Sequence, residues 1–401
     1  MTEWRKRCLG EITSFMSKGI PPKYVERENE NTVRVLNQKC NRNFEIKYEE
    51  SRLHDCSKKK VPADKMLQPG DVLINSTGTG TAGRVAQLYG VPTPTTIDGH
   101  MILLRPTEEI DSIYYGYAIK AFQPKIETLA EGSTGQTEIN RKRLQEEIVI
   151  SFPKGKETQE RIARFLLNID EKIKVNDKIN KNLYAQARAF VSNWKMENAG
   201  CYDLVLLSDV AVINPNTYSQ KEDWEYINYL DTSSITDGII SEMQRIVPNI
   251  EKLPSRARRK IFANDIVFST VRPNQRHYGI IYTPLPHMLA STGFAVIRSN
   301  YSKVCNELLY LCLTENEFIT KMQQLAEQST STFPSIKPSD LGGCKIPCAR
   351  GNEADNLTKI LKALFTLIAT NQSECTFLAE LRDSLLPKLM SGEIDISDID
   401  L

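Results

Sequence analysis

Two long stretches of the chain repeat an apolar residue at every seventh position, the pattern of a helix that packs lengthwise against a partner helix. The first stretch, residues 156–195, contains neither proline nor glycine. Its first seam consists of Ile162, Ile169, Asn176, Leu183 and Phe190. Its second, mixed seam consists of Phe165, Lys172, Ile179 and Gln186. The pattern predicts one helix of about 60 Å with a partner elsewhere in the chain.

The second stretch, residues 352–390, supplies that partner. Its seams consist of Leu357, Leu364, Asn371, Leu378 and Leu385, and of Ile360, Leu367 and Leu381. Asn371 lies 195 residues after Asn176 (371 − 176 = 195), and the same interval separates the other matching members of the first seam of each helix. If the helices are antiparallel, these two asparagines lie at about the same level, where a buried amide pair disfavours shifted registers. The alternative is that each asparagine faces solvent where the seam is frayed.

Short extended runs separated by turn-forming residues precede the first long helix. The runs are Val33–Asn37, Phe44–Tyr48, Asp71–Ser76, Arg84–Leu88 and His100–Arg105, and a helical patch follows at Ser112–Phe122. This pattern predicts a mixed, mostly β domain over residues 1–153.

Residues 200–350 repeat the layout of residues 1–153. The matching segments are Leu9–Ile12 with Leu207–Val210, Gly70–Thr77 with Asn264–Thr270 (with a one-residue gap), Asp98–Arg105 with Thr292–Arg298, and Leu129–Thr134 with Leu325–Thr330. The expected fold class is therefore α+β: two mixed, mostly β domains, 1–153 and 200–350, separated by two long antiparallel coiled-coil helices. Residues 154–199 contain the first helix, and residues 351–401 contain the second helix and an acidic tail; the internal repeat implies a pseudo-two-fold arrangement.

Bulk composition narrows the possible partners. The formal net charge of +1 excludes a global basic bias, so any binding of nucleic acid would depend on local patches. The nine cysteines form no CxxC pair, and no apolar run is long enough to cross a membrane. Together with the lack of a signal peptide, these features indicate a protein of the reducing cytoplasm.

Polar loops follow matching strands in the two halves. The loop at 77–84 is rich in glycine, which lets backbone N–H groups approach phosphate. It is not a nucleotide-hydrolysing P-loop, because Arg84 and Val85 stand where lysine and a hydroxyl are needed. The matching loop at 270–278 carries arginine, asparagine and glutamine, which suit guanine and adenine edges. We expect both loops to contact DNA; a plain strand connection or a solvated polar loop is the alternative.

Basic and hydroxyl-rich segments flank these loops in both halves. The basic clusters at 58–60 and 256–260 precede the strands at similar positions and could anchor phosphate, although such runs are usually solvated surface. The candidate DNA-binding residues are Lys58, Lys59, Lys60, Thr77, Gly78, Thr79, Gly80, Arg84, Thr134, Arg141, Arg256, Arg258, Arg259, Lys260, Thr270, Arg272, Asn274, Gln275, Arg276, His277, Tyr278, Thr330 and Lys337.

Catalytic signals are weak. The four histidines show no metal-ligand spacing, no Ser–His–acid set is suggested, and no glycine-rich motif for a methyl donor is present. No catalytic or metal-binding residue is therefore assigned. An alternative is a DNA methyltransferase or nuclease with its own recognition region, and another is a helical interaction scaffold without nucleic acid.

Two separate segments resemble one protein family. Ile169–Leu183 resembles the central spacer helix of specificity (S) subunits of Type I restriction–modification systems, and Leu385–Ile394 resembles their C-terminal signature. The strand that begins at Gly70 and the segment Leu129–Leu144 are similar to the family's target-recognition domains. The resemblance covers essentially the whole chain in the right order.

The resemblance implies a non-catalytic subunit whose two target-recognition domains each read one half of a bipartite, asymmetric double-stranded DNA site. The paired helices would set the spacing and bind two methyltransferase subunits, which restriction subunits with ATP-driven translocation would join. It implies no cofactor in this chain, since S-adenosylmethionine, ATP and Mg²⁺ would belong to the partner subunits. No DNA-contact residue can be carried over one to one, because these residues vary between members of the family.

Overall fold

The computed structural model describes residues 3–78, 80–132, 137–219, 221–241, 243–300, 304–329 and 333–394. The chain divides into two compact units, Met1–Lys174 with Cys375–Leu401 (unit 1) and Val175–Glu374 (unit 2). Each unit contains one mostly β domain and one half of each long helix, α4 (Lys156–Glu197) and α9 (Asn352–Ser391). Among the described residues, no helix combines the length and the apolar character that crossing a membrane requires.

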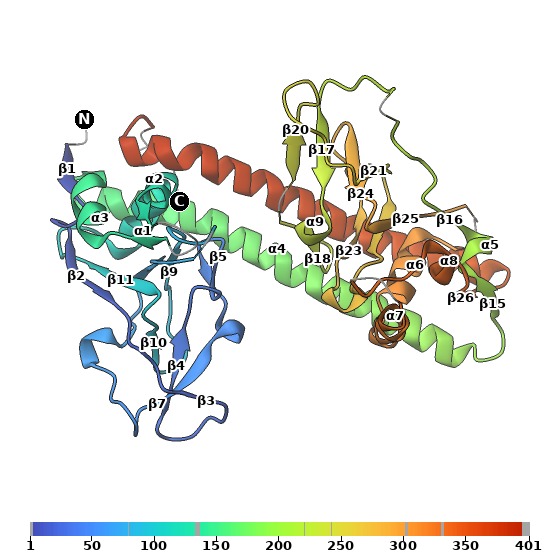
Figure 1. The fold of residues 1–401 in the computed structure, drawn as a ribbon, viewed down its shortest axis with the longest axis horizontal. Coiled ribbons are helices and arrows are strands. Elements are labelled where there is room, and N and C mark those ends of the chain that lie inside the picture. Colours follow the sequence, from blue (N-terminus) through green and yellow to red (C-terminus); the bar gives the residue numbers. More distant parts are fainter. Residues whose placement is uncertain are drawn as a thin grey trace. The chain divides into compact units, whose positions relative to one another are not determined.

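Unit 1 is built on a four-stranded antiparallel sheet in the order β2-β11-β8-β9 (Figure 1). Its strands are β2 (Thr13–Lys18), β11 (Met101–Pro106), β8 (Val72–Asn75) and β9 (Val85–Gln87). Val72 and Ile74 pack with Tyr114 of helix α1 (Ser112–Ala121), whereas Leu73 packs in a second apolar cluster with Leu36. Because β8 is buried on both faces, it needs a continuous apolar run rather than an alternating one.

A second sheet and several short elements complete unit 1. The sheet has the order β10-β4-β7-β3, and β4 and β10 run parallel. Its strands are β10 (Thr95–Ile97), β4 (Thr32–Leu36), β7 (Arg52–Asp55) and β3 (Tyr24–Val25). Two-stranded pairs are β1 (Trp4–Cys8) with β14 (Val149–Pro153), β5 (Asn41–Arg42) with β6 (Glu45–Ile46), and β12 (Ala130–Glu131) with β13 (Glu138–Ile139). The remaining helices are η1 (Tyr48–Glu50), η2 (Ala63–Lys65), α2 (Gln123–Thr128) and α3 (Arg141–Glu147).

Unit 2 repeats the central sheet of unit 1 strand for strand, in the order β16-β25-β22-β23. These strands are β16 (Ala211–Ile213), β25 (Phe294–Ser299), β22 (Asp265–Ser269) and β23 (Tyr278–Ile281). Its second sheet has the order β20-β17-β24-β21, with β20 (Gln244–Ile246), β17 (Ile227–Leu230), β24 (Met288–Ser291) and β21 (Ala257–Lys260). Two-stranded pairs are β15 (Asp203–Leu206) with β26 (Lys345–Cys348) and β18 (Ile235–Thr236) with β19 (Ile239–Ile240). The helices are α5 (Leu207–Val210), η3 (Thr232–Ser234), η4 (Pro273–Gln275), α6 (Asn306–Leu313), α7 (Asn316–Glu327) and α8 (Pro338–Gly342).

These elements confirm the expected α+β class and the internal repeat. Four of the five predicted runs are strands close to the expected bounds (β4, β8, β9 and β11), and the helical patch is α1. The run Phe44–Tyr48 is wrong in length, since only Glu45–Ile46 forms a strand there. Positive φ angles at Asn43 (51°) and Phe44 (66°) interrupt the extended backbone.

The same buried ion pair fixes the central sheet in both units. Arg105 of β11 donates from Nε to Oδ1 of Asp71 at 2.8 Å and from its guanidinium end to Oδ2 at 3.1 Å. Arg298 of β25 makes the same two contacts with Asp265, at 2.6 and 2.8 Å. Both carboxylates are buried and also accept a backbone N–H at 2.8 Å. A two-pronged, fully hydrogen-bonded pair of this kind offsets the cost of removing both charges from water.

The segments that begin at Gly70 and at Asn264 match in the structure without the one-residue gap that the sequence suggested. Gly70 and Asn264 both take positive φ angles, 90° and 67°, directly before the buried aspartate. The N–H groups of Ser76 and Thr270 each donate at 2.8 Å to the carbonyl before β11 or β25. The same interval in the sequence relates both pairs of residues (264 − 70 = 194 and 270 − 76 = 194). Thr270 therefore corresponds to Ser76 rather than to Thr77.

Each unit holds its halves of α4 and α9 together as an antiparallel pair. In unit 1, Asp170 pairs with Arg382, and three residues later the carbonyl of Ile173 accepts from the Cys375 thiol at 3.7 Å. The apolar members Ile162 and Ile169 of the first α4 seam and Leu357 of the α9 seam are buried, as expected.

The second seam of each helix was assigned wrongly. Lys172 and Gln186 are exposed, and Ile179 and Leu367 expose 41% and 54% of their surface. The buried positions follow the first seam by four residues rather than three, namely Leu166, Asn180, Ala187 and Trp194 on α4 and Leu361, Ile368 and Leu389 on α9. A seven-residue repeat allows either choice of the second position, and the packing partner decides between them.

The expected contact between Asn176 and Asn371 is also wrong. In unit 2, Asn371 donates to Oδ1 of Asn180 at 2.9 Å, while Asn176 donates to Oε2 of Glu374 at 2.7 Å. Asn176 and Asn180 are 1% and 5% exposed, so neither faces solvent. An amide pair does join the two helices, but its member on α4 lies one turn later than the sequence pattern suggested.

Candidate nucleic-acid interface

Three glycines shape the loop that joins β8 to β9. Gly78, Gly80 and Gly83 have φ angles of 111°, 69° and 88°. A Cβ atom at Gly83 would lie 2.7 Å from the Cα of Glu127, so a larger residue cannot be placed there without moving backbone. Gly80, by contrast, is exposed, and a Cβ built there meets no atom of the described residues within 4 Å. Gly80 therefore leaves space for another molecule to approach the backbone of this loop.

The N–H groups of this loop are largely used within it. Thr81 and Ala82 donate to the carbonyl of Gly78 at 3.1 and 2.9 Å, and Gly83 donates to Asn75 at 2.9 Å. The Thr77 hydroxyl lies 2.9 Å from Nδ1 of His100. The N–H groups of Thr81, Ala82 and Gly83 therefore point inward and are not available to a phosphate.

Positive charge at this loop comes from two arginines. The half-buried guanidinium of Arg84 donates to the carbonyl of Gly80 at 3.0 Å. Burial, and after it the charge of Arg42 on β5, lowers the pKa of Arg84. Two neighbouring guanidinium groups attract an anion such as a DNA phosphate. Arg42 was not singled out from the sequence, because it belongs to no basic run and comes near Arg84 only through the fold.

The corresponding loop of unit 2, residues 270–277, is held in an uncommon backbone conformation. Arg272 and Arg276, at the two ends of η4, have φ angles of 47° and 57°. Backbone hydrogen bonds from Arg272 to Pro334 (2.9 Å) and from Arg276 to Pro273 (3.0 Å) fix this geometry. Strained backbone of this kind persists where the surroundings over-determine it, and it often marks a binding loop.

The two arginine side chains have different environments. The exposed guanidinium of Arg272 lies 5.1 Å above the ring of Phe333, which exposes 51% of its surface. The guanidinium of Arg276 donates to Oδ1 of Asn316 at 2.7 Å and lies 3.8 Å from Asp237. Arg272 is therefore better placed to contact a base edge, and Arg276 holds the loop to its neighbours.

Three other candidates, in this loop or at the start of β23, have structural contacts. Thr270 is buried and donates to the carbonyl of Gly293 at 2.9 Å. Tyr278 is 3% exposed, and its hydroxyl donates to Asp237 at 2.8 Å; burial, then Asp237, raises its pKa to about 12. Nδ1 of His277 lies 2.7 Å from the carbonyl of Ile235. Thr270 and Tyr278 are too buried for direct contact with DNA, whereas the exposed Asn274 and Gln275 remain candidates.

The two basic clusters are not equivalent in the structure, contrary to expectation. Lys58, Lys59 and Lys60 are exposed residues that follow β7. Arg256 is exposed beside the edge strand β21, which contains Arg258, Arg259 and Lys260. In unit 1 the place of β21 beside β10 is taken by the segment around Leu67, whose N–H donates to Thr95 at 2.9 Å. The sequence analysis matched the three lysines to the basic cluster of β21. The loop between the basic cluster and the next strand of the central sheet is longer in the first half, so the lysines lie in a different segment.

Within the second cluster the four side chains differ in accessibility. Lys260 forms an ion pair with Glu222 and lies 5.2 Å above the ring of Trp224. The Nε atom of Arg259 is buried without a hydrogen-bond partner among the described residues, and burial lowers the pKa of this side chain. Arg256 is the exposed member of the cluster, and Arg258, Arg259 and Lys260 are half-buried.

The segments that leave each domain carry the remaining candidates. Arg141 is exposed at the first turn of α3, and Lys337 is exposed directly before α8. Thr79, Thr134 and Thr330 lie outside the described residues. Ile139 donates to Ser76 at 2.8 Å and Ile336 to Thr270 at 2.9 Å, so in both units the exit segment pairs with the base of the candidate loop.

An arginine–tyrosine stack on each second sheet was missed by the sequence analysis. Arg52 lies 3.4 Å above the ring of Tyr24 in unit 1, and Arg245 lies 4.1 Å above the ring of Tyr226 in unit 2. Trp224 stacks on His287 beside the second pair, with ring centroids 4.8 Å apart. Aromatic and guanidinium planes are surfaces on which nucleic acids are often bound. Only cross-strand pairing brings these residues together, so their separate positions in the sequence gave no signal.

The described residues contain no group of three or more His, Cys, Asp or Glu side chains arranged to hold a metal ion. The accessible chemistry of the candidate interface is instead that of cations, amides and aromatic planes on two similar frames. These are the groups of a surface that binds nucleic acid and distinguishes its bases.

Comparisons with known proteins agree with this class. Residues 1–185 match the family described as type I restriction modification DNA specificity domain. The HindI specificity subunit of Haemophilus influenzae is 34% identical over 90 residues, which span 22% of this chain and 20% of that relative. The MjaIX specificity subunit of Methanocaldococcus jannaschii is 21% identical over 309 residues, which span 72% of this chain and 69% of that relative.

A solved structure extends the fold similarity to nearly the whole chain. The S subunit of a type I restriction–modification system from M. genitalium covers 97% of this chain, and 96% of that subunit is covered, with a TM-score of 0.56 and 19% identity. The sequence resemblance is thus confirmed. Residues 1–185 thus share the type I restriction modification DNA specificity domain with specificity subunits, and nearly the whole chain shares the fold of one such subunit.

Proposed function

We propose that this chain selects the DNA sequence on which a type I restriction–modification complex acts, and that each of its two domains reads one half of a bipartite site. One observation carries the proposal. The same sheet order and the same buried Asp–Arg pair recur in both units, but the loops on this common frame differ completely. One loop is built of glycine and threonine and the other of arginine, asparagine and glutamine. A repeated frame with different loops suits the reading of two different half-sites.

The long helices support the assembly part of the proposal. They hold apolar side chains at the surface, including Val175 (48% exposed) and Ile179 (41%) on α4 and Phe377 (62%) on α9. Exposed apolar residues on charged helices are typical of surfaces that bind another protein. We propose that α4 and α9 set the spacing of the half-sites and bind two methyltransferase subunits, to which restriction subunits attach.

The proposal includes the absence of catalysis by this chain. Methyl transfer with S-adenosylmethionine, and ATP- and Mg²⁺-dependent translocation, are assigned to the partner subunits. Incubation of the purified chain with labelled methyl donor and DNA should transfer no label, whereas addition of methyltransferase subunits should restore transfer. Label transfer by the chain alone would support the alternative of a complete DNA methyltransferase.

The DNA-reading part is tested by binding to matched oligonucleotides. A duplex with both half-sites should bind at least about 1,000-fold more tightly than a random duplex, and affinity should fall steeply with salt as phosphate contacts release counterions. Half-sites identified by sequencing methylated genomic DNA, with and without this gene, supply the probe. Equal affinity for either half-site alone and for the complete site would contradict the two-reader arrangement.

A further inference from the structure

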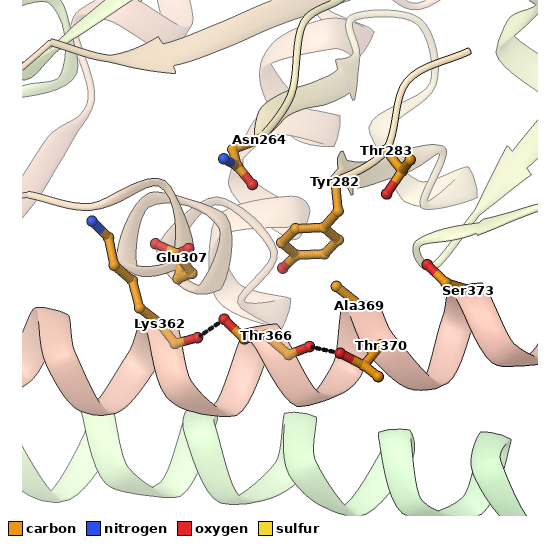
Figure 2. Close-up of a pocket in the computed structure, with 9 residues that line it drawn as sticks. All are labelled: Asn264, Tyr282, Thr283, Glu307, Lys362, Thr366, Ala369, Thr370 and Ser373. Atoms are coloured by element: carbon orange, nitrogen blue, oxygen red, sulfur yellow. Dashed lines mark hydrogen bonds between the residues drawn. The ribbon is translucent and has the colours of Figure 1, made fainter.

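A cleft in unit 2 is lined by side chains of both charge signs. It has a volume of about 550 Å³ and lies between the domain and α9 (Figure 2). Its lining includes the carboxylate of Glu307 and the ammonium group of Lys362. Because the two charges oppose each other, the cleft selects neither an anion nor a cation. A more specific arrangement of polar groups lies in unit 1, beside the glycine-rich loop.

His100 lies directly before β11, next to the start of the glycine-rich loop. It is exposed, and its backbone carbonyl accepts the N–H of Ser76 at 2.8 Å. Its Nδ1 atom lies 2.9 Å from the hydroxyl of Thr77. Among the described residues, no hydrogen bond is made to its other ring nitrogen, Nε2. The Nε2 atom can therefore contact another molecule.

His100 also connects two parts of the candidate interface of unit 1. On one side it contacts Thr77, which begins the glycine-rich loop. On the other side its backbone N–H donates to the buried carboxylate of Asp98 at 2.9 Å. The hydroxyl of Tyr24, which carries the stacked guanidinium of Arg52, donates to the same carboxylate. A DNA duplex that contacts both the loop and the stack would therefore lie against His100.

A chain of amide side chains lies behind the imidazole. Asn41 and Asn75 are fully buried, and Nδ2 of Asn41 donates to Oδ1 of Asn75 at 3.2 Å. Nδ2 of Asn75 donates to the carbonyl of Gln38 at 3.1 Å, and Oε1 of Gln38 lies 3.4 Å from the Thr77 hydroxyl. These contacts hold Thr77, and through it the imidazole, in one orientation. Burying amides is costly, so a chain of them that ends at an exposed side chain indicates a role for that side chain.

Unit 2 shows that the shared fold forms without this histidine. Gly293 takes the place of His100, because both carbonyls accept the N–H at the base of the candidate loop (293 − 100 = 193). The apolar Ile235 takes the place of Asn41 in the matching hairpin, β18–β19 instead of β5–β6 (235 − 41 = 194). The histidine and the buried amide behind it are therefore particular to unit 1.

The contacts of the ring make Nε2 a hydrogen-bond donor. The Thr77 hydroxyl has one hydrogen and is closer to Nδ1 of His100 (2.9 Å) than to Oε1 of Gln38 (3.4 Å). We therefore assign this hydrogen to the contact with Nδ1, which leaves the hydrogen of the neutral imidazole on Nε2. The charged imidazolium carries a hydrogen there as well. In the major groove of DNA, the acceptor that adenine and guanine share is N7.

We propose that His100 determines specificity in the half-site read by unit 1, by donating a hydrogen bond from Nε2 to N7 of a purine in the major groove. This inference rests on the proposed function and extends it to a single base contact. The competing acceptor is a DNA phosphate, which every sequence presents alike. The experiments below therefore separate a contact with a base from a contact with the backbone.

The first test combines a change in the DNA with a change in the protein. A 7-deazapurine replaces N7 by a C–H group and is introduced at one purine at a time throughout the two-part site. At one position, in one half-site only, it should weaken binding of the unmutated full chain about tenfold. The same substitution should not weaken binding of His100→Ala further, because the hydrogen bond is already lost. Equal losses for both proteins at every position would overturn the proposal.

Conservative variants separate the base contact from support of the loop. The amide nitrogen of glutamine can take the place of Nε2, whereas that of asparagine takes the place of Nδ1. His100→Gln should therefore keep part of the preference for the purine, and His100→Asn should bind like His100→Ala. The control Glu108→Ala, an exposed residue beyond the other end of β11, should leave binding unchanged. Identical binding by all three His100 variants would mean that the ring only supports Thr77, and the proposal would be wrong.

Binding to a random duplex identifies a phosphate contact. His100→Ala should change the affinity for a random duplex by less than about twofold, because the N7 contact forms only at the correct base. A similar loss on the specific and the random duplex would assign His100 to the backbone and refute its role in specificity. If the unmutated chain itself binds its two-part site no better than a random duplex, the proposed function fails. An intact preference without coupling between His100 and N7 refutes only the contact proposed here.

Discussion

The two units differ most where each central sheet meets its long helices. In unit 1 the hydroxyl of Tyr117 donates to Asp170 at 2.5 Å, and Asp170 pairs with Arg382. In unit 2 the matching tyrosine, Tyr310 (310 − 117 = 193), packs edge-on against Phe365, with ring centroids 6.0 Å apart. Phe365 in turn matches Asp170 by the interval that relates the two long helices (365 − 170 = 195). A polar network in one unit is thus replaced by an aromatic contact in the other.

At two neighbouring positions, too, a charged residue of unit 1 corresponds to an apolar residue of unit 2. Arg382 corresponds to Ala187 (382 − 187 = 195), which is fully buried among apolar residues. Lys120 at the end of α1 corresponds to Leu313 (313 − 120 = 193), which is also fully buried. The shared fold therefore accommodates either a polar network or apolar packing where the central sheet meets the long helices. Apolar packing favours stability, whereas a buried ion pair gives less stability but penalises any arrangement that leaves a charge unpaired.

The largest expected effect is on the ion pair of unit 1. Arg382→Met leaves Asp170 buried without its partner and should lower the free energy of unfolding by about 3–5 kcal/mol, measured by urea titration. The double change Asp170→Phe with Arg382→Ala copies unit 2 and should recover most of this loss. The exposed ion pair of Arg350 with Asp203 is the control, and Arg350→Ala should have little effect on stability. A double variant no more stable than Arg382→Met would show that the two junctions are not interchangeable.

Much of the frame could be predicted because it depends on local pattern. Strand β8 was visible as an apolar run, and the repeated Asp71 and Asp265 marked the internal repeat. The helix seams were predicted only in part, because a seven-residue period does not say whether the second buried position lies three or four residues on. Leu367 was therefore placed inside and is 54% exposed.

The candidate interface was less predictable, since residue type does not reveal which side chains are already engaged. Tyr278 and Thr270 looked like polar loop residues but are buried by the sheet that they terminate. Arg42 and the Arg245–Tyr226 stack depend on contacts between strands that are distant in sequence.

Substitutions in the candidate loop of unit 2 test whether the loops of the two units read separate half-sites. Arg272→Ala removes an exposed guanidinium and should reduce discrimination at one half-site by about 1–3 kcal/mol, with no effect at the other. Arg276→Ala should have a smaller effect on discrimination, because its guanidinium holds Asn316 rather than facing outward. Binding to duplexes with single-base changes in either half measures both effects. Equal loss at both halves would mean that the two domains do not read separately.

The charged junction of unit 1 should also have a pH dependence that the apolar junction of unit 2 lacks. Burial, then the charge of Arg382, lowers the pKa of Lys120 from 10.5 to about 8, against the opposing effect of Asp170, Asp383 and Glu45. Between these pH values the unfolded chain binds more protons than the folded one, so stability should rise with pH across this range.

The size of this effect is about 1–2 kcal/mol after allowance for solvent screening. Lys120→Met, which copies the apolar Leu313 of unit 2, should abolish it. Urea titrations of both proteins from pH 7 to pH 10.5 measure the difference between them. A constant difference across this range would contradict the assignment.

The smallest expected effect concerns the amide pair of unit 2, which has no counterpart at the ion-paired junction of unit 1. Asn371 bonds Asn180 at 2.9 Å, and Asn180 also donates to the carbonyl of Ile368 at 3.4 Å. Changing both asparagines to leucine replaces a buried polar pair by apolar packing, which should raise stability by about 1 kcal/mol while weakening the preference for one register. Changing Asn371 alone to leucine leaves Oδ1 of Asn180 without the donor that it has now, and this change should be destabilising. Disulfide trapping between cysteines placed at matched and shifted levels of α4 and α9 reports the register. If the double variant keeps a single register, then the packing of apolar side chains sets the register of α4 against α9, and the amide pair does not.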